Sequence, residues 1–206
     1  MKIKVCGMRA PHNIAEILSL KPDWMGFIFY PKSKRFVQEI PEMPASEVKK
    51  IGVFVDHPQT ELFAIASNNE LDGLQLHGDE TPEYVQQIRD GFKGILIKAI
   101  SVDEHTDFGI LQKYEPYVDY FLFDTKGAEK GGNGVRFDWN TLMNYTLQKP
   151  IILSGGIGLE DAAELKEFIH TSALPIEVID VNSRFEDAPG LKNFNKLNEF
   201  IQIIRK

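Results

Sequence analysis

Side chains that can transfer protons follow several short apolar runs in this sequence. Cys6 ends one run, Asp124 ends a second, and His77 ends a third. Aspartate is depleted in strand interiors, so its place at the end of an apolar run is notable. Each residue also has a plain structural interpretation: a small buried thiol, a loop-capping carboxylate or a hydrogen-bonded wall residue. Position alone leaves the chemical and the structural interpretations open.

Small residues follow two further apolar runs near the end of the chain. Gly155 and Gly156 come after one run, and Asn182 and Ser183 come after the next. Such residues are ordinary in turns. They are also typical of backbone segments that bind a phosphate through N–H groups.

Eight short apolar runs are spaced along the chain and end in polar or glycine residues. Continuous apolar runs of this kind are typical of parallel strands buried on both faces. The predicted strands are Ile3–Cys6, Trp24–Tyr30, Ile51–Val55, Gly73–His77, Ile95–Ile100, Tyr120–Asp124, Ile151–Ser154 and Ile176–Val181.

Segments with helical spacing separate most of these runs. The clearest start is Thr81-Pro82-Glu83, where a threonine cap precedes proline and an acid. The second connection contains Pro41 and Pro44, so any helix there is expected to be short. The alternation predicts an α/β fold, and eight units fit a single (β/α)8 TIM barrel over residues 1–206. An open flavodoxin-like or Rossmann-like sheet remains the structural alternative.

Composition narrows the class of protein. The chain has 206 residues and a net charge of −7, which disfavours nonspecific binding of nucleic acid. One cysteine allows no internal disulfide, and neither a secretory signal nor a membrane-length apolar run is evident. We expect a cytoplasmic protein with no membrane or nucleic-acid partner, and a monomer.

The strand ends place chemistry at one mouth of the predicted barrel, because active sites of this fold lie at the carboxyl ends of the strands. These segments together resemble the phosphoribosylanthranilate isomerase family, and the matches run in order from residue 3 to residue 192. They include Lys4-Val5-Cys6-Gly7-Met8, Ser33-Lys34-Arg35, Gln75-Leu76-His77-Gly78-Asp79-Glu80, Asp124-Thr125, Gly132-Asn133-Gly134, Leu153-Ser154-Gly155-Gly156, Asp180-Val181-Asn182-Ser183 and Pro189-Gly190-Leu191-Lys192.

The resemblance implies an Amadori rearrangement in tryptophan biosynthesis, with a phosphosugar substrate and without a metal or an organic cofactor. It implies that Cys6 is the general base at sugar C2 and that Asp124 is the general acid at the furanose ring oxygen. It also implies that Arg35 binds the anthranilate carboxylate, a contact for which a planar guanidinium is suited.

Further site residues follow from the same resemblance. Gly155, Gly156, Asn182 and Ser183 are expected to bind the phosphate. Gln75, His77, Gly132, Gly134 and Asp180 are expected to lie against the rest of the substrate. One departure concerns Arg184, where family members commonly have glycine; this arginine would either add to phosphate binding or point outward.

Two other functions are considered. Another phosphosugar-handling barrel enzyme would share the phosphate site, but a synthase of that kind is expected to carry a lysine near the end of strand one or two. Strand one here ends in Cys6-Gly7, and Lys32 and Lys34 lie in a loop. A catalytically inactive phosphosugar-binding barrel would need neither Cys6 nor Asp124, and the presence of both argues against it.

Overall fold

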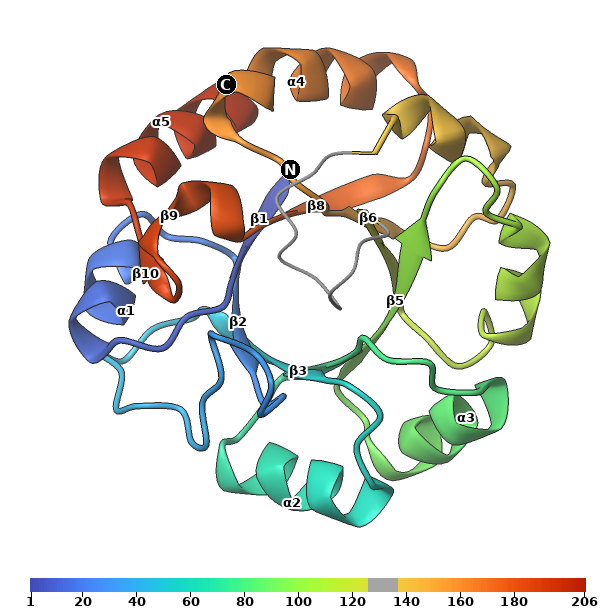
Figure 1. The fold of residues 1–206 in the computed structure, drawn as a ribbon, viewed down its shortest axis with the longest axis horizontal. Coiled ribbons are helices and arrows are strands. Elements are labelled where there is room, and N and C mark those ends of the chain that lie inside the picture. Colours follow the sequence, from blue (N-terminus) through green and yellow to red (C-terminus); the bar gives the residue numbers. More distant parts are fainter. Residues whose placement is uncertain (126–136) are drawn as a thin grey trace.

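The eight predicted strands form a closed parallel barrel. The computed structural model describes residues 1–125 and 137–206. In chain order the strands pair as β1-β2-β3-β4-β5-β6-β7-β8, and β8 pairs with β1 to close the ring (Figure 1). Their bounds are Lys2–Cys6, Trp24–Ile28, Lys49–Phe54, Gly73–Leu76, Ile95–Val102, Tyr120–Thr125, Ile151–Leu153 and Ile176–Val181.

The helices surround the barrel on its outside, as Figure 1 shows. The α-helices are α1 (Pro11–Leu18), α2 (Gln59–Asn68), α3 (Pro82–Gly91), α4 (Ala162–Thr171) and α5 (Phe194–Arg205). Short 3₁₀ helices span Phe108–Lys113, Trp139–Asn144, Leu159–Asp161 and Ser183–Phe185. A small antiparallel hairpin of β9 (Glu186–Ala188) and β10 (Leu191–Lys192) follows the last barrel strand.

Most of the expected local structure is confirmed, and the predicted strand ends differ from the observed ones by at most two residues. The Thr81 side chain accepts a hydrogen bond from the backbone N–H of Tyr84, so it caps α3 as predicted. The β2–β3 connection, which holds Pro41 and Pro44, contains no helix. Among the described residues, the segments after β5 and β6 form 3₁₀ helices and no α-helix.

Alternation along each strand separates two apolar layers. Ile3 and Val5 of β1 face outward into the large core between barrel and helices. Inside the barrel, a smaller apolar cluster fills the lower half: Trp24, Ile51, Ile97, Ala99, Leu122, Ile152 and Val178. Above this cluster the inward positions become polar. The apolar side chains therefore fill the lower part of the interior, and polar side chains line it toward the carboxyl ends of the strands, where active sites of this fold lie.

Candidate active site

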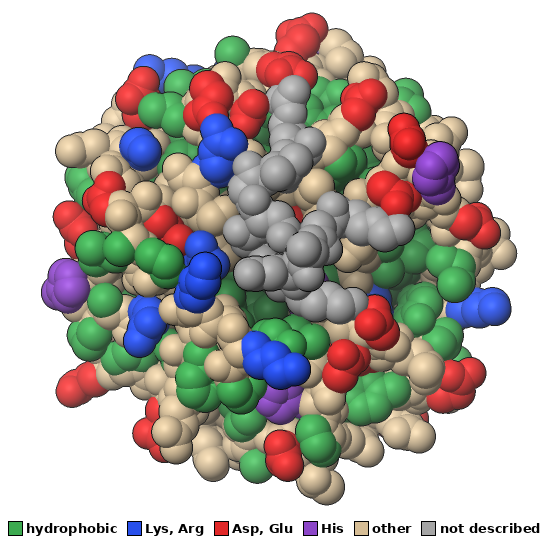
Figure 2. Space-filling model, viewed as in Figure 1, with side chains coloured by type: hydrophobic (Ala, Val, Ile, Leu, Met, Phe, Trp, Pro, Cys, Tyr) green, Lys and Arg blue, Asp and Glu red, His purple; other side chains and the backbone are tan. Residues whose placement is uncertain are grey.

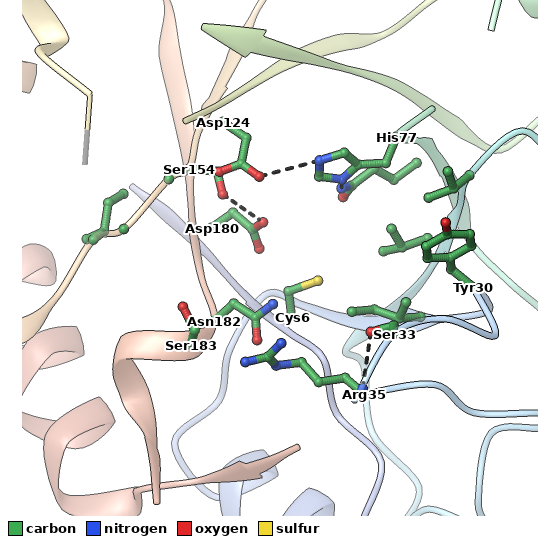
Figure 3. Close-up of a pocket in the computed structure, with 17 residues that line it drawn as sticks. Cys6, Tyr30, Ser33, Arg35, His77, Asp124, Ser154, Asp180, Asn182 and Ser183 are labelled. Carbon is green, nitrogen blue, oxygen red and sulfur yellow. Dashed lines mark hydrogen bonds and ion pairs between the residues drawn. The ribbon is translucent and has the colours of Figure 1, made fainter. Parts of the chain in front are cut away.

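A pocket opens at the carboxyl ends of the strands and gathers most of the predicted site residues (Figure 3). It is lined by predicted site residues together with apolar and hydroxyl side chains of neighbouring strands: Cys6, Ile28, Tyr30, Ser33, Arg35, Val53, Val55, Gln75, His77, Asp124, Ser154, Gly155, Gly156, Ile157, Asp180, Asn182 and Ser183. Gly132 and Gly134, which were also predicted, lie outside the described residues.

Cys6 is the last residue of β1, and its thiol faces the pocket with 4% of the residue exposed. Gly26 of β2 makes room for it, because a Cβ at that glycine would lie 2.7 Å from the Cys6 sulfur. Burial raises the pKa of the Cys6 thiol, while the ammonium groups of Lys4 and Lys192 act in the opposite direction. The thiol therefore needs these cations if it is to act as a base near neutral pH.

Asp124 is held from two sides at the end of β6. Its Oδ1 accepts a hydrogen bond of 2.9 Å from the backbone N–H of Thr125, and its Oδ2 lies 3.4 Å from Nε2 of His77. Gly155 lets the loop after β7 pass close by: its φ is +92°, and a Cβ there would lie 2.5 Å from Thr125 Oγ1. The carboxyl group is thus fixed at the pocket wall, 7% of the residue being exposed.

Lys4 is a buried cation next to the predicted site that the sequence alone did not single out. It points into the barrel, is fully buried, and lies 3.0 Å from Asp180 Oδ1 and 2.8 Å from Gln75 Oε1. Although burial opposes its charge, Asp180 and the neighbouring thiol hold the pKa of Lys4 above its ordinary value. A signal was present in the sequence, since a lysine between Ile3 and Val5 interrupts an apolar strand.

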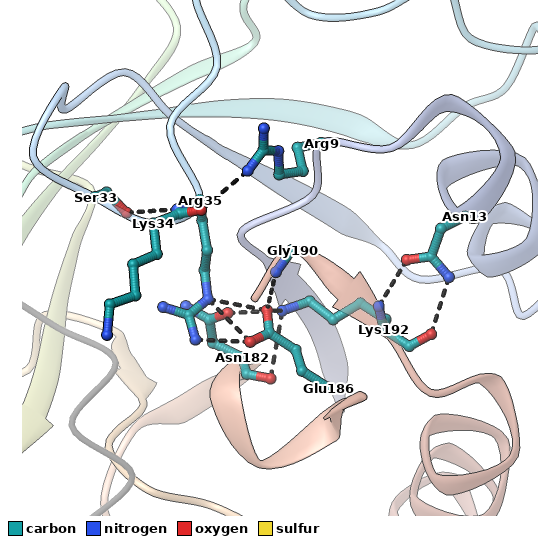
Figure 4. Close-up of polar contacts among 9 residues, drawn as sticks. All are labelled: Arg9, Asn13, Ser33, Lys34, Arg35, Asn182, Glu186, Gly190 and Lys192. Carbon is teal, nitrogen blue, oxygen red and sulfur yellow. Dashed lines mark hydrogen bonds and ion pairs between the residues drawn. The ribbon is translucent and has the colours of Figure 1, made fainter. Parts of the chain in front are cut away.

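Arg35 lines the pocket from the segment that follows β2, and Glu186 of β9 holds its guanidinium. The Nε and Nη2 atoms of Arg35 donate to the Glu186 carboxylate at distances of 2.6 to 3.1 Å (Figure 4). Lys192 donates to the same carboxylate at 2.6 Å and to Asn182 Oδ1 at 2.6 Å. Against its burial, the two cations hold the pKa of Glu186 below its ordinary value. Arg35 is therefore positioned by two residues that were not predicted as part of the site.

The predicted phosphate-binding residues come together beside one another on the pocket wall. Gly155 and Gly156 follow β7, and Asn182 and Ser183 follow β8, which is its neighbour in the barrel. Arg184 takes the outward alternative: its guanidinium forms an ion pair with Glu160, and both side chains are largely exposed. The arginine at this position therefore leaves the adjacent pocket wall to small residues.

Charge is distributed unevenly around the mouth, despite the acidic composition of the chain. In Figure 2 basic side chains gather to the left of the mouth, over the segments that follow β2 and β8, whereas acidic side chains are spread around the whole outline. In the described part of the chain, no group of three or more His, Cys, Asp or Glu side chains could hold a metal ion. No helix in the same part is long and apolar enough to span a membrane.

The chain is similar to one family along nearly its whole length. Residues 3–203 match the family model for N-(5'-phosphoribosyl)anthranilate isomerase. A relative of that name from Parabacteroides distasonis is 46% identical over 211 residues, covering 99% of this chain and 93% of the relative.

Solved structures agree with this match. The phosphoribosyl anthranilate isomerase of Thermus thermophilus superposes with a TM-score of 0.84 at 25% identity, covering 100% of this chain and 98% of the other. An isomerase structure in complex with reduced 1-(o-carboxyphenylamino)-1-deoxyribulose 5-phosphate gives a TM-score of 0.81 at 26% identity and the same coverage. A monomeric form of the dimeric enzyme from Thermotoga maritima gives a TM-score of 0.78 at 26% identity, again covering 100% of this chain and 98% of the other.

Proposed function

This chain belongs to the N-(5'-phosphoribosyl)anthranilate isomerase family, and we propose that Cys6 is the general base and Asp124 the general acid of the reaction. The reaction is an Amadori rearrangement in tryptophan biosynthesis. It converts N-(5'-phosphoribosyl)anthranilate into 1-(2-carboxyphenylamino)-1-deoxyribulose 5-phosphate. The substrate is a small phosphosugar. The reaction is an isomerisation, so the substrate gains and loses only protons.

The rearrangement needs one proton delivered and one removed. Protonation of the furanose ring oxygen lets the C1–O bond break while the anilino nitrogen forms a double bond to C1. Removal of the C2 proton then gives an enolamine, which becomes the ketose. Asp124 is the proton donor for the first step, and Cys6 is the base for the second.

One observation carries this assignment: the thiol of Cys6 and the carboxyl of Asp124 line one pocket from strands far apart in the sequence (Figure 3). Lys4 and Lys192, buried beside the pocket, lie close enough to influence the thiol. A cation near the thiol favours the thiolate, the form that removes a proton. A binding protein without catalysis would have no need for that arrangement.

The same pocket supplies binding groups for the two anionic ends of the substrate. Gly155, Gly156, Asn182 and Ser183 are proposed to hold the phosphate, and Arg35 the anthranilate carboxylate. Gln75, His77 and Asp180 line the space between these ends. A structure determined with inorganic phosphate should place the anion against the loops after β7 and β8. An anion bound only at the opposite mouth of the barrel would overturn this part of the proposal.

A direct assay tests the function itself. Purified protein is mixed with N-(5'-phosphoribosyl)anthranilate, and the fluorescence of the anthranilate adduct is followed with time. Turnover without added metal or organic cofactor is expected. Binding without turnover would favour the inactive phosphosugar-binding barrel, and turnover of a different phosphosugar alone would favour another enzyme of this fold.

Three further properties belong to the proposal. Residues 1–206 are proposed to act as one domain, because the barrel takes strands from both ends of the chain. A cytoplasmic location fits an unpaired buried cysteine. A monomer is proposed, and sedimentation at micromolar concentration tests it; a dimer, as in the enzyme of Thermotoga maritima, is the alternative outcome.

A further inference from the structure

The interior of the barrel contains a chain of polar contacts that leads from Lys4 to Asp124. Lys4 Nζ lies 2.8 Å from Gln75 Oε1, Gln75 Nε2 lies 2.8 Å from His77 Nδ1, and His77 Nε2 lies 3.4 Å from Asp124 Oδ2. Gln75 is 1% exposed, so both ends of its amide must find partners within the protein. This chain of contacts joins residues at three strands, β1, β4 and β6.

The direction of each hydrogen bond in this chain follows from Lys4. An ammonium group has three donors and no acceptor, so the Gln75 atom that faces it must be the carbonyl oxygen. The amide NH₂ of Gln75 then faces His77 and donates to Nδ1. A ring nitrogen that accepts a hydrogen bond carries no proton, so the proton of neutral His77 must lie on Nε2.

The other end of this hydrogen-bond chain fits the same tautomer in the state that follows proton donation. Nε2 of His77 faces a carboxylate oxygen of Asp124, which once ionised can only accept hydrogen bonds. In that state the opposite tautomer would place a lone pair on Nε2 against the lone pairs of that oxygen. The charge of Lys4 is itself supported by Asp180, whose other oxygen accepts from Ser154 Oγ at 3.3 Å. Every donor from Lys4 onward therefore points toward Asp124.

We propose that Lys4 and Gln75 are positioning residues that fix His77 as the Nε2–H tautomer, so that its ring donates to the proton donor Asp124. When Asp124 gives its proton to the ring oxygen, negative charge develops on the carboxylate. A chain of aligned donors that ends at an ammonium stabilises that charge, and aligned hydrogen bonds strengthen one another. Gln75 and His77 then serve Asp124 instead of merely lining the cavity.

This inference rests on the proposed role of Asp124 for its catalytic meaning, but its structural content can be tested without substrate. The protein is labelled with ¹⁵N-histidine, and the protonation of each ring nitrogen is read from two-bond ¹H–¹⁵N correlations at a pH where the rings are neutral. The chain has five histidines, and a His77→Asn variant identifies the His77 signals by their loss. His77 should show a protonated Nε2 and an unprotonated Nδ1.

The decisive variant is Gln75→Glu. A carboxylate beside Lys4 can only accept hydrogen bonds, so Nδ1 of His77 should become protonated, in either the neutral ring or the imidazolium. Gln75→Met removes the donor without reversing it. Both variants keep the Lys4–Asp180 pair, so they avoid the unpaired buried carboxylate that Lys4→Met would create. Lys2→Met is the matched control: it removes an ammonium from the same strand and should leave the His77 signals unchanged.

Kinetics supply the second measurement. Gln75→Glu should lower kcat by roughly ten- to a hundredfold with a much smaller change in KM, because the acid is misoriented while the substrate contacts remain. A wild-type His77 with its proton on Nδ1, or an unchanged Nδ1 in Gln75→Glu, would overturn the inference and leave the roles of Cys6 and Asp124 intact. The expected tautomer together with a fully active Asp124→Asn variant would instead sink the proposed function.

Discussion

Two lysines of β1 lie two residues apart, and each pairs with a carboxylate of β8, yet Lys2 lies at the open lower end of the barrel and Lys4 lies inside it. Lys2 pairs with Glu177 at 2.9 Å, and their side chains are 44% and 43% exposed. Lys4 pairs with Asp180 at 3.0 Å, and their side chains are 0% and 5% exposed. The lower pair lies in water and the upper pair does not, although their geometry is almost the same.

This difference in burial decides what each pair can do. Water and salt screen an exposed pair, so Lys2 contributes little and influences nothing beyond its contacts. A buried ammonium acts on its neighbours through a low dielectric, and Lys4 influences Cys6, Gln75 and Asp180 together. The lower end of the barrel is thus closed by apolar and solvent-exposed groups, and the proposed chemistry lies at the upper end, where charges are buried.

The largest effect is expected from Cys6 and Asp124, the two residues proposed to transfer protons at the upper end. Asp124→Asn cannot donate a carboxylic proton, and Cys6→Ser replaces the thiol with a much weaker acid. Each should lower kcat by about 10²–10⁴-fold with a smaller change in KM, because general acid and base catalysis supply that order. Steady-state fluorescence assays measure both constants.

Tyr120→Phe is the control for that prediction, because Tyr120 begins the strand that contains Asp124, and it contacts Lys2 at the lower end. Its kcat should equal that of the wild type. The double variant Cys6→Ser/Asp124→Asn should lose less than the product of the single losses, since the two groups serve one reaction. A folded single variant that keeps kcat within about threefold would contradict the assigned role, given the size of such contributions.

The next effect concerns stability at the upper end. Lys4→Met leaves the Asp180 carboxylate buried without its cation, so the free energy of unfolding should fall by about 3–5 kcal/mol. Urea unfolding followed by circular dichroism measures it. Lys4→Met/Asp180→Leu should recover much of the loss, because an apolar pair leaves no buried charge unpaired. If Lys4→Met lowered the free energy of unfolding no more than the loss of a surface ion pair does, the contrast between the two ends would be wrong.

The sequence predicts much of the upper end, because the strands carry it. Cys6, His77 and Asp124 end apolar runs, and parallel strands in a closed barrel must bring their carboxyl ends to one mouth. Side chains alternate along each strand, so the side of the sheet that a residue at a strand end faces can be inferred without knowledge of its partners. The resemblance to a family then assigns the roles that position alone leaves open.

The positioning residues were harder to predict, for two physical reasons. Lys4 lies within a strand, and a single lysine in a strand is usually assigned to a solvated edge or end. Glu186 and Lys192 lie in the hairpin after β8, and the contact between Glu186 and Arg35 spans 151 residues of sequence. Loop contacts of that separation depend on the path of the chain after each strand, which no periodicity in the sequence encodes.

Arg35 offers a third, intermediate effect at the upper end. Arg35→Ala should raise KM more than it lowers kcat, because the proposed contact with the substrate carboxylate persists from ground state to transition state. The loss in kcat/KM should be roughly 1.5–3 kcal/mol, the size of a hydrogen bond to a charged group. Arg9→Ala is the matched control, since Arg9 donates only to the backbone oxygen of Lys34 in the same segment among its described contacts. An unchanged kcat/KM in Arg35→Ala would reduce this arginine to a structural partner of Glu186.

The smallest effect is expected at the lower end, where Lys2→Met should lower the free energy of unfolding by about 0–1 kcal/mol. The hydrogen bond with Glu177 raises the pKa of Lys2 and lowers the pKa of Glu177. A raised lysine pKa gives stability that is lost as pH rises through it, and a lowered carboxyl pKa gives stability that is lost as pH falls through it. The contribution of this pair should therefore be greatest near neutral pH and fade toward both extremes.

The dependence of stability on salt concentration distinguishes the exposed Lys2 pair from the buried Lys4 pair most sharply. At about 1 M salt the screening length is near 3 Å, so the cost of Lys2→Met should vanish. The cost of Lys4→Met should persist, because ions and water do not enter between Lys4 and Asp180, whose side chains are almost fully buried. Urea unfolding of both variants at low and high salt makes the comparison directly. If salt reduced the loss in unfolding free energy by the same fraction in both variants, burial would not be what distinguishes these lysines. The influence of Lys4 on Cys6 and Gln75 would then need another cause.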